Sequence, residues 1–475
     1  MKILIAAAES TPFVKTGGLA DVIGALPKAL KQNGEDVRVI LPKYRGISGE
    51  YRDAMSHMGE VKVYVGWRSQ YCGIETLVHE GIPIYFIDNE YYFGRDGVYG
   101  YMDDGERFAF FNRAVLEVLR LIDFQAEVIH CHDWHTAMIP MLLQAHYQHD
   151  PFYQDMRTVF TIHNLLYQGV FPYEVMGDLL GLDNQYYLGV EYYGKMNFMK
   201  AGITYSDHVT TVSPTYAREI QTSYYGNGLD GLLSSLGGKL TGIVNGIDTK
   251  SYNPNSDSHI YVKYRSNLAK KKENKVELQR ELNLPSNPDI PMIAMVTRLV
   301  EMKGLDLVIR SLDELLQHEN IQVVVLGTGD SSYEDWFREA AYRYPEKLSV
   351  QIRFSEGLSR KIYAASDLFL MPSKFEPCGI SQLLALRYGS IPIVRETGGL
   401  NDTVQAYNEF TGEGNGFSFG AYNAYDMMHT IKRALSIYNQ SDHWRQITKN
   451  AFNGDYSWNV SAKEYTDIYH SISTR

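Results

Sequence analysis

The sequence has few cysteines, no long apolar run and no excess of basic residues, and each absence excludes a class of protein. Only three cysteines occur in 475 residues, which argues against a disulfide framework and favours a reducing compartment. No apolar run reaches the roughly 18–20 residues that a membrane-spanning helix needs. Lys and Arg total 45 against 56 Asp and Glu, and this net charge of −11 argues against a nucleic-acid binder.

Chain length and the early onset of structure set expectations for domains and location. A chain of 475 residues exceeds one ordinary domain, so two or three domains are expected. Because a strand is predicted from the first residues onward, we expect no signal or transit peptide. The sequence therefore predicts a cytoplasmic protein without a membrane partner.

The N-terminal segment predicts a strand, a glycine turn and a helix in succession. Residues 3–5 are apolar and precede three alanines, which indicates a buried parallel strand. Gly17 and Gly18 follow a loop, and residues 19–30 have helical periodicity. This geometry directs free backbone N–H groups at an anion, and Lys15 lies beside the turn. The alternative is that the glycines only close the turn and Lys15 is an ordinary surface lysine.

Strand and helix patterns alternate along two stretches of the chain, separated by a lysine-rich segment. The apolar runs of the first stretch are Val37–Leu41, Ile82–Ile87, Val128–Cys131, Thr158–Ile162 and His208–Val212. Those of the second are Met292–Val296, Ile321–Leu326, Val350–Phe354, Leu368–Met371 and Ile391–Val394. Helical patterns at 106–121 and 135–147 lie between strands, and the segment 253–281 is interpreted as a solvated helix face. The alternation predicts two doubly wound α/β domains, with ligands at the carboxyl ends of their strands in a cleft between them.

Two motifs that suggest a cofactor or a metal fail on their context. The GxGxxG at Gly226–Gly231 follows a polar, tyrosine-rich segment instead of a strand, so it does not predict a dinucleotide site. The histidine cluster His130–His135 lacks HExxH or CxxC spacing, so no zinc site is expected. His132 and Asp133 are instead predicted at the carboxyl end of a strand, where polar groups reach a cleft.

Polar and cationic residues follow several other predicted strands. His163 and Asn164 end one strand, and Arg298 and Lys303 follow another. Each pair alone is compatible with an ordinary capped loop. Together with Lys15, the two cations of the second stretch could bind a diphosphate.

Glu376 lies between a predicted strand and a helix that is expected to begin near Gly379. It is either a carboxylate that contacts a ligand or a helix-start residue that the helix dipole stabilises. Pro377 as a first helical residue fits the second interpretation.

Six motifs, in a fixed order, resemble those of a known family. They are Lys15–Asp21, His132–His135, Thr161–Asn164, Arg298–Gly304, Phe375–Gly379 and Thr397–Leu400. In sequence and order they resemble the bacterial glycogen synthase and plant starch synthase family, from Met1 to about Trp458. The resemblance implies the GT-B fold, with two facing Rossmann-like domains and a cleft between them. The implied domains are 1–247, with 457–475 crossing back to it, and 248–456.

The resemblance implies a retaining glucosyltransferase. It would transfer glucose from ADP-glucose to the nonreducing 4-hydroxyl of an α-1,4-glucan such as glycogen, in the bacterial cytoplasm, without a metal or cofactor and without a nucleic-acid partner. A retaining hydrolase uses two carboxylates beside the anomeric carbon, and no such nucleophile can be assigned here. The implied reaction is therefore a same-face transfer, in which the leaving phosphate takes the proton of the acceptor hydroxyl.

Roles of single residues also follow from the resemblance. The implied catalytic residues are Glu376, His163, Arg298 and Lys303. Glu376 would hold the donor glucose near its 3-hydroxyl, and His163 would lie near the 6-hydroxyl and the reacting carbon. Arg298 and Lys303 would bind phosphate. The implied donor contacts are Lys15, Gly17, Gly18, Asp21, Cys378, Gly379 and Ser381. The implied glucose and acceptor side comprises Asp133, Asn164 and Tyr99. One departure is Leu384, where the wider superfamily often has a second glutamate that bears on ribose recognition.

Three other functions remain as alternatives. Another GT-B enzyme with a small acceptor is disfavoured by the order of all six motifs. A glucan-binding scaffold without catalysis would not need the cations Lys15, Arg298 and Lys303. A nicotinamide dehydrogenase would carry its phosphate fingerprint after the first strand, where this sequence has none.

Overall fold

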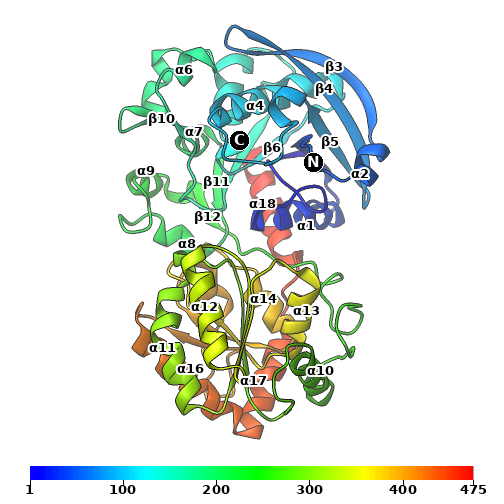
Figure 1. Cartoon of the computed structure of the whole chain (residues 1–475). Helices are drawn as coiled ribbons and strands as arrows, with labels where there is room; N and C mark the ends of the chain where they lie inside the picture. The colour runs from blue at the N-terminus through cyan, green and yellow to red at the C-terminus, as the bar shows by residue number, and fades with distance from the viewer. Residues whose placement is uncertain (474–475) are drawn as a thin grey trace. The chain divides into compact units, whose positions relative to one another are not determined.

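The computed structural model describes residues 1–473 and divides into two compact units (Figure 1). The first unit comprises Met1–Asn245 and the chain from Trp458 onward, and the second comprises Gly246–Ser457. The sequence placed these boundaries at 247/248 and 456/457, and the last two residues of its predicted return segment lie outside the described residues. Both units are α/β, which confirms the predicted fold class.

The first unit is built on a nine-stranded sheet in the order β12-β11-β7-β6-β1-β2-β5-β4-β3. The strands are β1 Lys2–Ala6, β2 Asp36–Pro42, β3 Ser56–Val65, β4 Arg68–His79, β5 Ile82–Asp88, β6 Val128–His132, β7 Arg157–Ile162, β11 His208–Thr211 and β12 Leu240–Gly242. The strands from β12 to β5 in this order pair in parallel, whereas β3, β4 and β5 pair antiparallel. The first unit is therefore a doubly wound sheet extended by a hairpin that the sequence analysis did not predict.

Helices and a small second sheet complete the first unit. The helices are α1 Gly18–Gln32, α2 Gly49–Ala54, α3 Glu90–Phe93, α4 Asp104–Leu121, α5 Met138–Leu142, α6 Val175–Asp178, α7 Phe198–Tyr205, α8 Pro214–Glu219, α9 Asp230–Ser235 and α18 Asn459–Ser473. The small sheet consists of β8 Val170–Phe171, β9 Glu191–Tyr192 and β10 Lys195–Asn197. Tyr465 and Tyr469 of α18 lie in the same buried cluster as Ile3 and Ile5 of β1. This helix (red in Figure 1) is thus part of the core of the first unit, beside α1.

The second unit has a six-stranded parallel sheet in the order β15-β14-β13-β16-β17-β18. The strands are β13 Met292–Val296, β14 Gln322–Leu326, β15 Leu348–Gln351, β16 Leu368–Met371, β17 Ile391–Arg395 and β18 Phe417–Phe419. The helices are α10 Leu268–Glu281, α11 Leu305–His318, α12 Ser331–Arg343, α13 Glu356–Ala365, α14 Ser381–Arg387, α15 Gly398–Thr403, α16 Ala424–Tyr438 and α17 Ser441–Asn453. Ile293 and Met295 lie in one buried cluster, whereas Met292 and Ala294 lie in another. Alternate residues of β13 therefore face opposite helix layers, as in a doubly wound fold.

Two predicted elements differ from the structure by more than two residues or are divided. The strand expected at Val350–Phe354 is β15, which pairs with β14 from Leu348 to Gln351 and leaves Phe354 84% exposed. The helix expected over 135–147 is divided into a 3₁₀ turn, α5 and a π-helical turn. Pro140 lies in the first turn of α5, where a missing N–H costs no hydrogen bond, so the sequence favours a new helix start there.

The lysine-rich segment is only partly solvated, which corrects the sequence interpretation. Lys271 of α10 is 4% exposed, and its ammonium donates to the carbonyl oxygens of Tyr363 and Ala364 at 3.0 and 2.9 Å. These carbonyls end α13, whose last turn has no intrahelical donors for them. Burial lowers the pKa of Lys271 to about 7. One side of α10 is thus buried in the second unit, where Lys271 hydrogen-bonds it to the end of α13.

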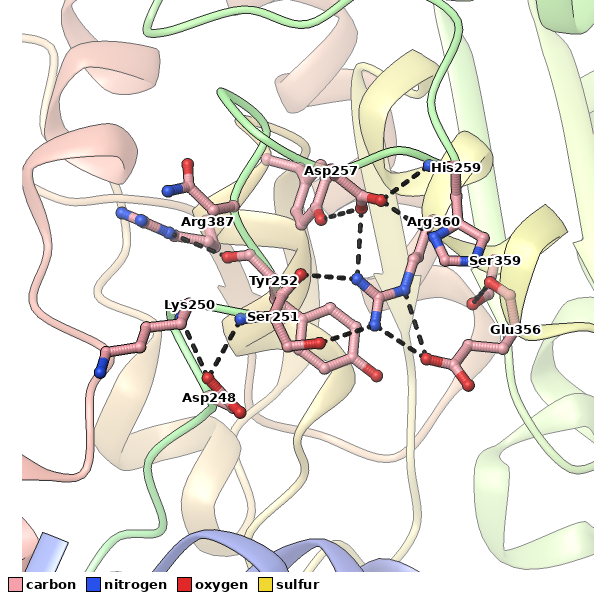
Figure 2. Close-up of polar contacts among 12 residues, drawn as sticks. Asp248, Lys250, Ser251, Tyr252, Asp257, His259, Glu356, Ser359, Arg360 and Arg387 are labelled. Carbon is pink, nitrogen blue, oxygen red and sulfur yellow. Dashed lines mark hydrogen bonds and ion pairs between the residues drawn. The ribbon is translucent and has the colours of Figure 1, made fainter. Parts of the chain in front are cut away.

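The first residues of the second unit are held by an arginine of α13 (Figure 2). The Arg360 guanidinium donates to the carbonyl oxygen of Ser251 at 2.7 Å and to its hydroxyl at 3.0 Å. It also forms ion pairs with Asp257 and Glu356, at 3.3 and 2.8 Å. The coil that follows β12 is therefore fixed to the α/β core of the second unit.

Candidate functional site

In both units, most of the sequence-predicted site residues follow the carboxyl ends of parallel strands, whereas Tyr99 lies between α3 and α4. In each sheet the strand order reverses at one point, between β1 and β6 in the first unit and between β13 and β16 in the second. Loops that leave the two central strands diverge there, which makes this point the usual ligand site of an open α/β sheet. The loops after β1 and β6 carry Lys15 and Asp133, and those after β13 and β16 carry Arg298 and Glu376.

The glycine turn of the first unit forms as the sequence predicts. Gly17 precedes α1, which begins at Gly18, so the N-terminal amides of a helix lie at the switch point of the sheet. The Lys15 ammonium lies 2.7 Å from Oδ1 of Asp21, and both side chains are partly exposed. The structure thus brings together the lysine, the glycines and the aspartate that the sequence analysis assigned to the donor.

A buried carboxylate that the sequence analysis missed organises this turn. Oε2 of Glu9 accepts the backbone N–H of Thr16 at 2.5 Å, and the side chain is nearly inaccessible to solvent. Burial raises the pKa of Glu9, although the N–H groups of Thr16 and Gly17 counteract part of that rise. The available signal was an acidic residue directly after the first strand and before a glycine turn. Glu9 gives the loop a fixed partner for its amides.

Asp133 and His163 are joined by a hydrogen bond at the ends of β6 and β7. Oδ1 of Asp133 accepts the backbone N–H of His163 at 2.8 Å. Asp133 has φ 58° and ψ 179°, a conformation that is nearly restricted to glycine and costs about 1–3 kcal/mol. Burial raises the pKa of Asp133 to about 7, while the N–H groups of His163 and Asn164 oppose the shift. Strain and an unusual pKa at one residue are typical of a functional site.

The side chain of His163 is a neutral imidazole beside a second histidine. Its Nε2 lies 2.9 Å from Nδ1 of His132, and burial lowers the pKa of His163 to about 3. Asn164, the next residue, accepts the N–H of Leu166 with its side-chain oxygen at 3.0 Å. His163 therefore offers hydrogen bonds without a charge near pH 7.

Tyr99 lies against the histidine that ends the second motif. Its ring stacks on His135 with 4.4 Å between centroids and an interplanar angle of 28°. Burial raises the pKa of Tyr99 well above its usual value and lowers that of His135 to about 3. The phenol of Tyr99 therefore stays protonated and can donate a hydrogen bond near Asp133.

In the second unit, Glu376 is held by two donors. Its Oε2 lies 2.6 Å from the Lys303 ammonium and accepts the Ser373 hydroxyl at 3.0 Å. The following helix, α14, begins only at Ser381, so the interpretation of Glu376 as a helix-start residue is wrong. Glu376 is 8% exposed, and such a buried carboxylate needs a cation and a hydrogen bond. Ser373 is a further site residue, and its signal in the sequence was only its place directly after β16.

Two glycines let the loops of the second unit approach closely. Gly304 has φ 74°, and a Cβ there would lie 2.0 Å from the carbonyl oxygen of Pro372. Gly398 has φ 46°, and a Cβ there would lie 1.9 Å from the carbonyl oxygen of Glu376. Both positions need glycine for conformation and for space. The three motifs of this unit thus pack into one structure around Glu376.

The remaining donor candidates surround this centre. Cys378 is buried, and Gln382 donates to the carbonyl oxygens of Cys378 and Gly379 at 3.0 Å each. Ser381 is the first residue of α14. Arg298 is exposed, and within residues 1–473 its guanidinium forms no ion pair or hydrogen bond. Gln382, which the sequence analysis did not assign, fixes the loop that carries Cys378 and Gly379.

Two expectations from the sequence concern a metal site and a membrane-spanning helix. Across the described residues, no three His, Cys, Asp or Glu side chains gather as a group suited to a metal ion. None of the helices in the described part of the chain has the length and apolar character needed to cross a bilayer.

The sequence matches two protein-family profiles. Residues 2–235 match the starch synthase catalytic domain, and residues 277–451 match the glycosyl transferases group 1. The chain is 58% identical to a glycogen synthase of Desulforamulus reducens, over 99% of each chain. It is 56% identical to a glycogen synthase of Bacillus subtilis, over 100% of this chain and 98% of that one.

Solved structures resemble the fold over its whole length. The catalytic domain of starch synthase IV from Arabidopsis thaliana, bound to ADP and acarbose, has a TM-score of 0.93 and 35% identity, covering 100% of this chain and 99% of that one. A sucrose-phosphate synthase from Thermosynechococcus elongatus has a TM-score of 0.62 at 15% identity, covering 99% and 98%. The second likeness concerns the fold alone.

Proposed function

This chain belongs to the glycogen synthase and starch synthase family, and from that premise we propose that it transfers glucose from ADP-glucose to the nonreducing 4-hydroxyl of an α-1,4-glucan. It is a glycosyltransferase with the GT-B fold. One observation carries the proposal: in each unit, two of the family motifs follow the strands that flank the switch point of the sheet, and a third follows the next strand. The Arabidopsis relative bound to ADP and acarbose supports a nucleotide diphosphate donor and a glucan acceptor.

The cations of the site are proposed to bind the donor diphosphate. Arg298 and Lys303 serve this role on the second unit, and Lys15 serves it on the first, with Gly17, Gly18 and Asp21 beside it. Charge develops on the diphosphate as the glucosyl bond breaks, and fixed cations stabilise that charge in the transition state. Both lysines have a carboxylate partner, at 2.7 and 2.6 Å, so each ammonium is already oriented.

Glu376 is proposed to orient the donor glucose without attacking it. Oε2 of Glu376 is engaged by Lys303 and Ser373, and its other oxygen, Oε1, is proposed to accept a hydroxyl of the donor glucose. In the proposed same-face transfer, the bond from the anomeric carbon to the diphosphate oxygen breaks and the bond to the acceptor 4-oxygen forms. The acceptor proton passes to the departing phosphate. Cys378 and Gly379 lie on the same loop as Glu376, and Ser381 begins the helix that follows. All three are proposed to contact sugar and phosphate.

The first unit is proposed to hold the glucose and acceptor side of the reaction. His163 supplies a neutral hydrogen-bonding group near the reacting carbon. Asp133 and Asn164 lie at the same strand ends, and Tyr99 stacks on His135 beside them. This chemistry needs proton transfer and charge stabilisation, which these side chains and the cations supply, so no metal or cofactor is proposed. We propose that the reaction takes place in the bacterial cytoplasm, in keeping with relatives that are bacterial glycogen synthases.

A donor-competition assay tests this function. The purified protein is incubated with glycogen and labelled ADP-glucose or UDP-glucose, and radioactivity in washed polymer is counted. We expect faster incorporation from ADP-glucose. Equal rates would remove the donor assignment, and no incorporation from either donor would remove the enzymatic assignment.

A further inference from the structure

We propose that His132 is a positioning residue that fixes the tautomer of His163, so that His163 presents a neutral Nδ1–H to the substrate. The inference rests on the proposed function in naming the substrate side, but the tautomer itself is a property of the protein alone. His132 is the last residue of β6, and His163 follows β7, its parallel neighbour. Strand pairing therefore sets the distance between the two rings.

The hydrogen bond between the rings has two possible arrangements. Nδ1 of His132 lies 2.9 Å from Nε2 of His163, and a neutral imidazole has one N–H donor and one acceptor nitrogen. If His132 donates, His163 carries its proton on Nδ1. If His163 donates, its Nδ1 is a bare acceptor. The two cases present opposite hydrogen-bonding groups to a substrate.

The surroundings of the other ring nitrogen of His132, Nε2, decide between these arrangements. Its Nε2 is buried and has no hydrogen-bond partner among the described residues. Buried N–H groups without an acceptor are rarer in proteins than acceptors without a donor. Nε2 of His132 is therefore the lone-pair nitrogen, and its proton lies on Nδ1. His132 then donates to Nε2 of His163, which leaves the proton of His163 on Nδ1.

The surroundings keep both rings neutral. The His130 ring packs on His132 with 4.0 Å between centroids, and its own nitrogens contact the Tyr469 hydroxyl at 2.7 Å and the Thr161 hydroxyl at 2.6 Å. A positive charge on one imidazole would lie beside two other imidazoles inside the protein. Burial accordingly lowers the pKa of His130 to about 3 and that of His132 well below its usual value.

The Nδ1 of His163 is left for a ligand. Within residues 1–473 no side chain or backbone group bonds to it. The backbone N–H of His163 is fixed by Asp133 at 2.8 Å, so main chain and ring are both held. A sugar oxygen at this strand end would thus meet a neutral donor of fixed direction.

Two variants of His132 separate positioning from packing. Asparagine places an amide N–H near the position of Nδ1 and can still donate to His163, whereas leucine has similar bulk and no donor. We expect His132→Leu to lower kcat at least tenfold further than His132→Asn, with ADP affinity unchanged in both. Exposed His149 provides the control His149→Leu, for which wild-type kcat is expected. Equal kcat for the Asn and Leu variants would overturn the proposal.

The tautomer is measured directly on the unsubstituted protein. Long-range ¹H–¹⁵N spectra of protein with ¹⁵N-labelled histidines distinguish Nδ1–H from Nε2–H, and the spectrum of His163→Gln assigns the His163 signals. We expect the Nδ1–H form of His163 from pH 6 to 8. The Nε2–H form would overturn the proposal even if both His132 variants fail to fold. A protein that shows the expected tautomer but transfers no glucose would refute the proposed function and leave the tautomer assignment standing.

Discussion

The ammonium of Lys303 lies 2.6 Å from Oε2 of Glu376, although the two residues are 73 positions apart in the sequence. The contact joins the loop after β13 to the loop after β16, on either side of the switch point of the second sheet. A candidate phosphate ligand and a candidate sugar ligand thus orient one another. Removing the charge of either residue therefore leaves the other without this ionic partner.

Substitution of Glu376 by alanine should reduce turnover strongly. Loss of one preorganised group in a transition state costs roughly 3–4 kcal/mol, so kcat should fall about a hundredfold to a thousandfold. ADP affinity should hold or increase, because Lys303 loses its carboxylate partner. Steady-state kinetics and titration calorimetry measure the two effects. Glu301→Ala, which removes an exposed partner of Lys374, is the control. Normal turnover with a lower melting temperature would make Glu376 a structural residue.

Substitution of Lys15 by alanine should weaken ADP binding without unfolding the protein. A hydrogen bond to a charged group is worth about 1.5–3 kcal/mol, so Kd for ADP should rise at least about tenfold. The exposed pair with Asp21 adds only about 0–1 kcal/mol to stability, so Tm should hardly change. Lys28→Ala removes a comparable surface pair with Glu80, at 2.6 Å, and should leave Kd unaltered. An unchanged Kd for Lys15→Ala would make Lys15 an ordinary surface lysine.

Substitution of Asp133 by asparagine should change the pH dependence of stability. Because folding raises the pKa of Asp133 to about 7, the folded state holds this proton more tightly than the unfolded chain. The free energy of unfolding of the wild type therefore falls as pH rises from about 4 to above 7. Asparagine keeps the acceptor for the His163 N–H and does not ionise. Tm of Asp133→Asn minus that of the wild type should thus increase between pH 5 and pH 8, whereas a constant difference would contradict the raised pKa.

Glucosyl transfer should not depend on a divalent metal. In the proposed function, the cations Lys15, Arg298 and Lys303 supply positive charge for the diphosphate, which is the role that Mg²⁺ has in many phosphoryl enzymes. Activity should therefore survive an excess of EDTA, measured as glucose incorporated into glycogen. Loss of activity with EDTA, restored by one divalent ion, would show that a metal takes part.

Local patterns were enough to predict most of the fold. Buried parallel strands are continuous apolar runs, and the glycine turn before α1 has a local signature, so both were found. The β3–β4 hairpin was missed although Val61, Val63 and Val65 alternate with polar residues, which is the pattern of a half-buried antiparallel strand. A short alternation of valines and polar residues indicates a strand less strongly than a continuous apolar run does.

Contacts between distant residues could not be predicted in the same way. The polar character of Lys271 indicates a solvated helix face, and only the fold places the end of α13 against it. The partner of His132 likewise depends on strand order, which no local pattern contains. The motifs indicated the candidate site residues, whereas the hydrogen bonds of those residues required the three-dimensional structure.

The place of α18 has a consequence for how the protein is made. His130 and its partner Tyr469 are 339 positions apart, and the whole second unit is translated between them. Until the ribosome has released α18, the nascent first unit presents the apolar surface of α1 and β1 that Tyr465 and Tyr469 later cover. The core of the first unit can therefore be completed only after the whole second unit has been translated. A chain arrested before residue 459 would be a client for chaperones.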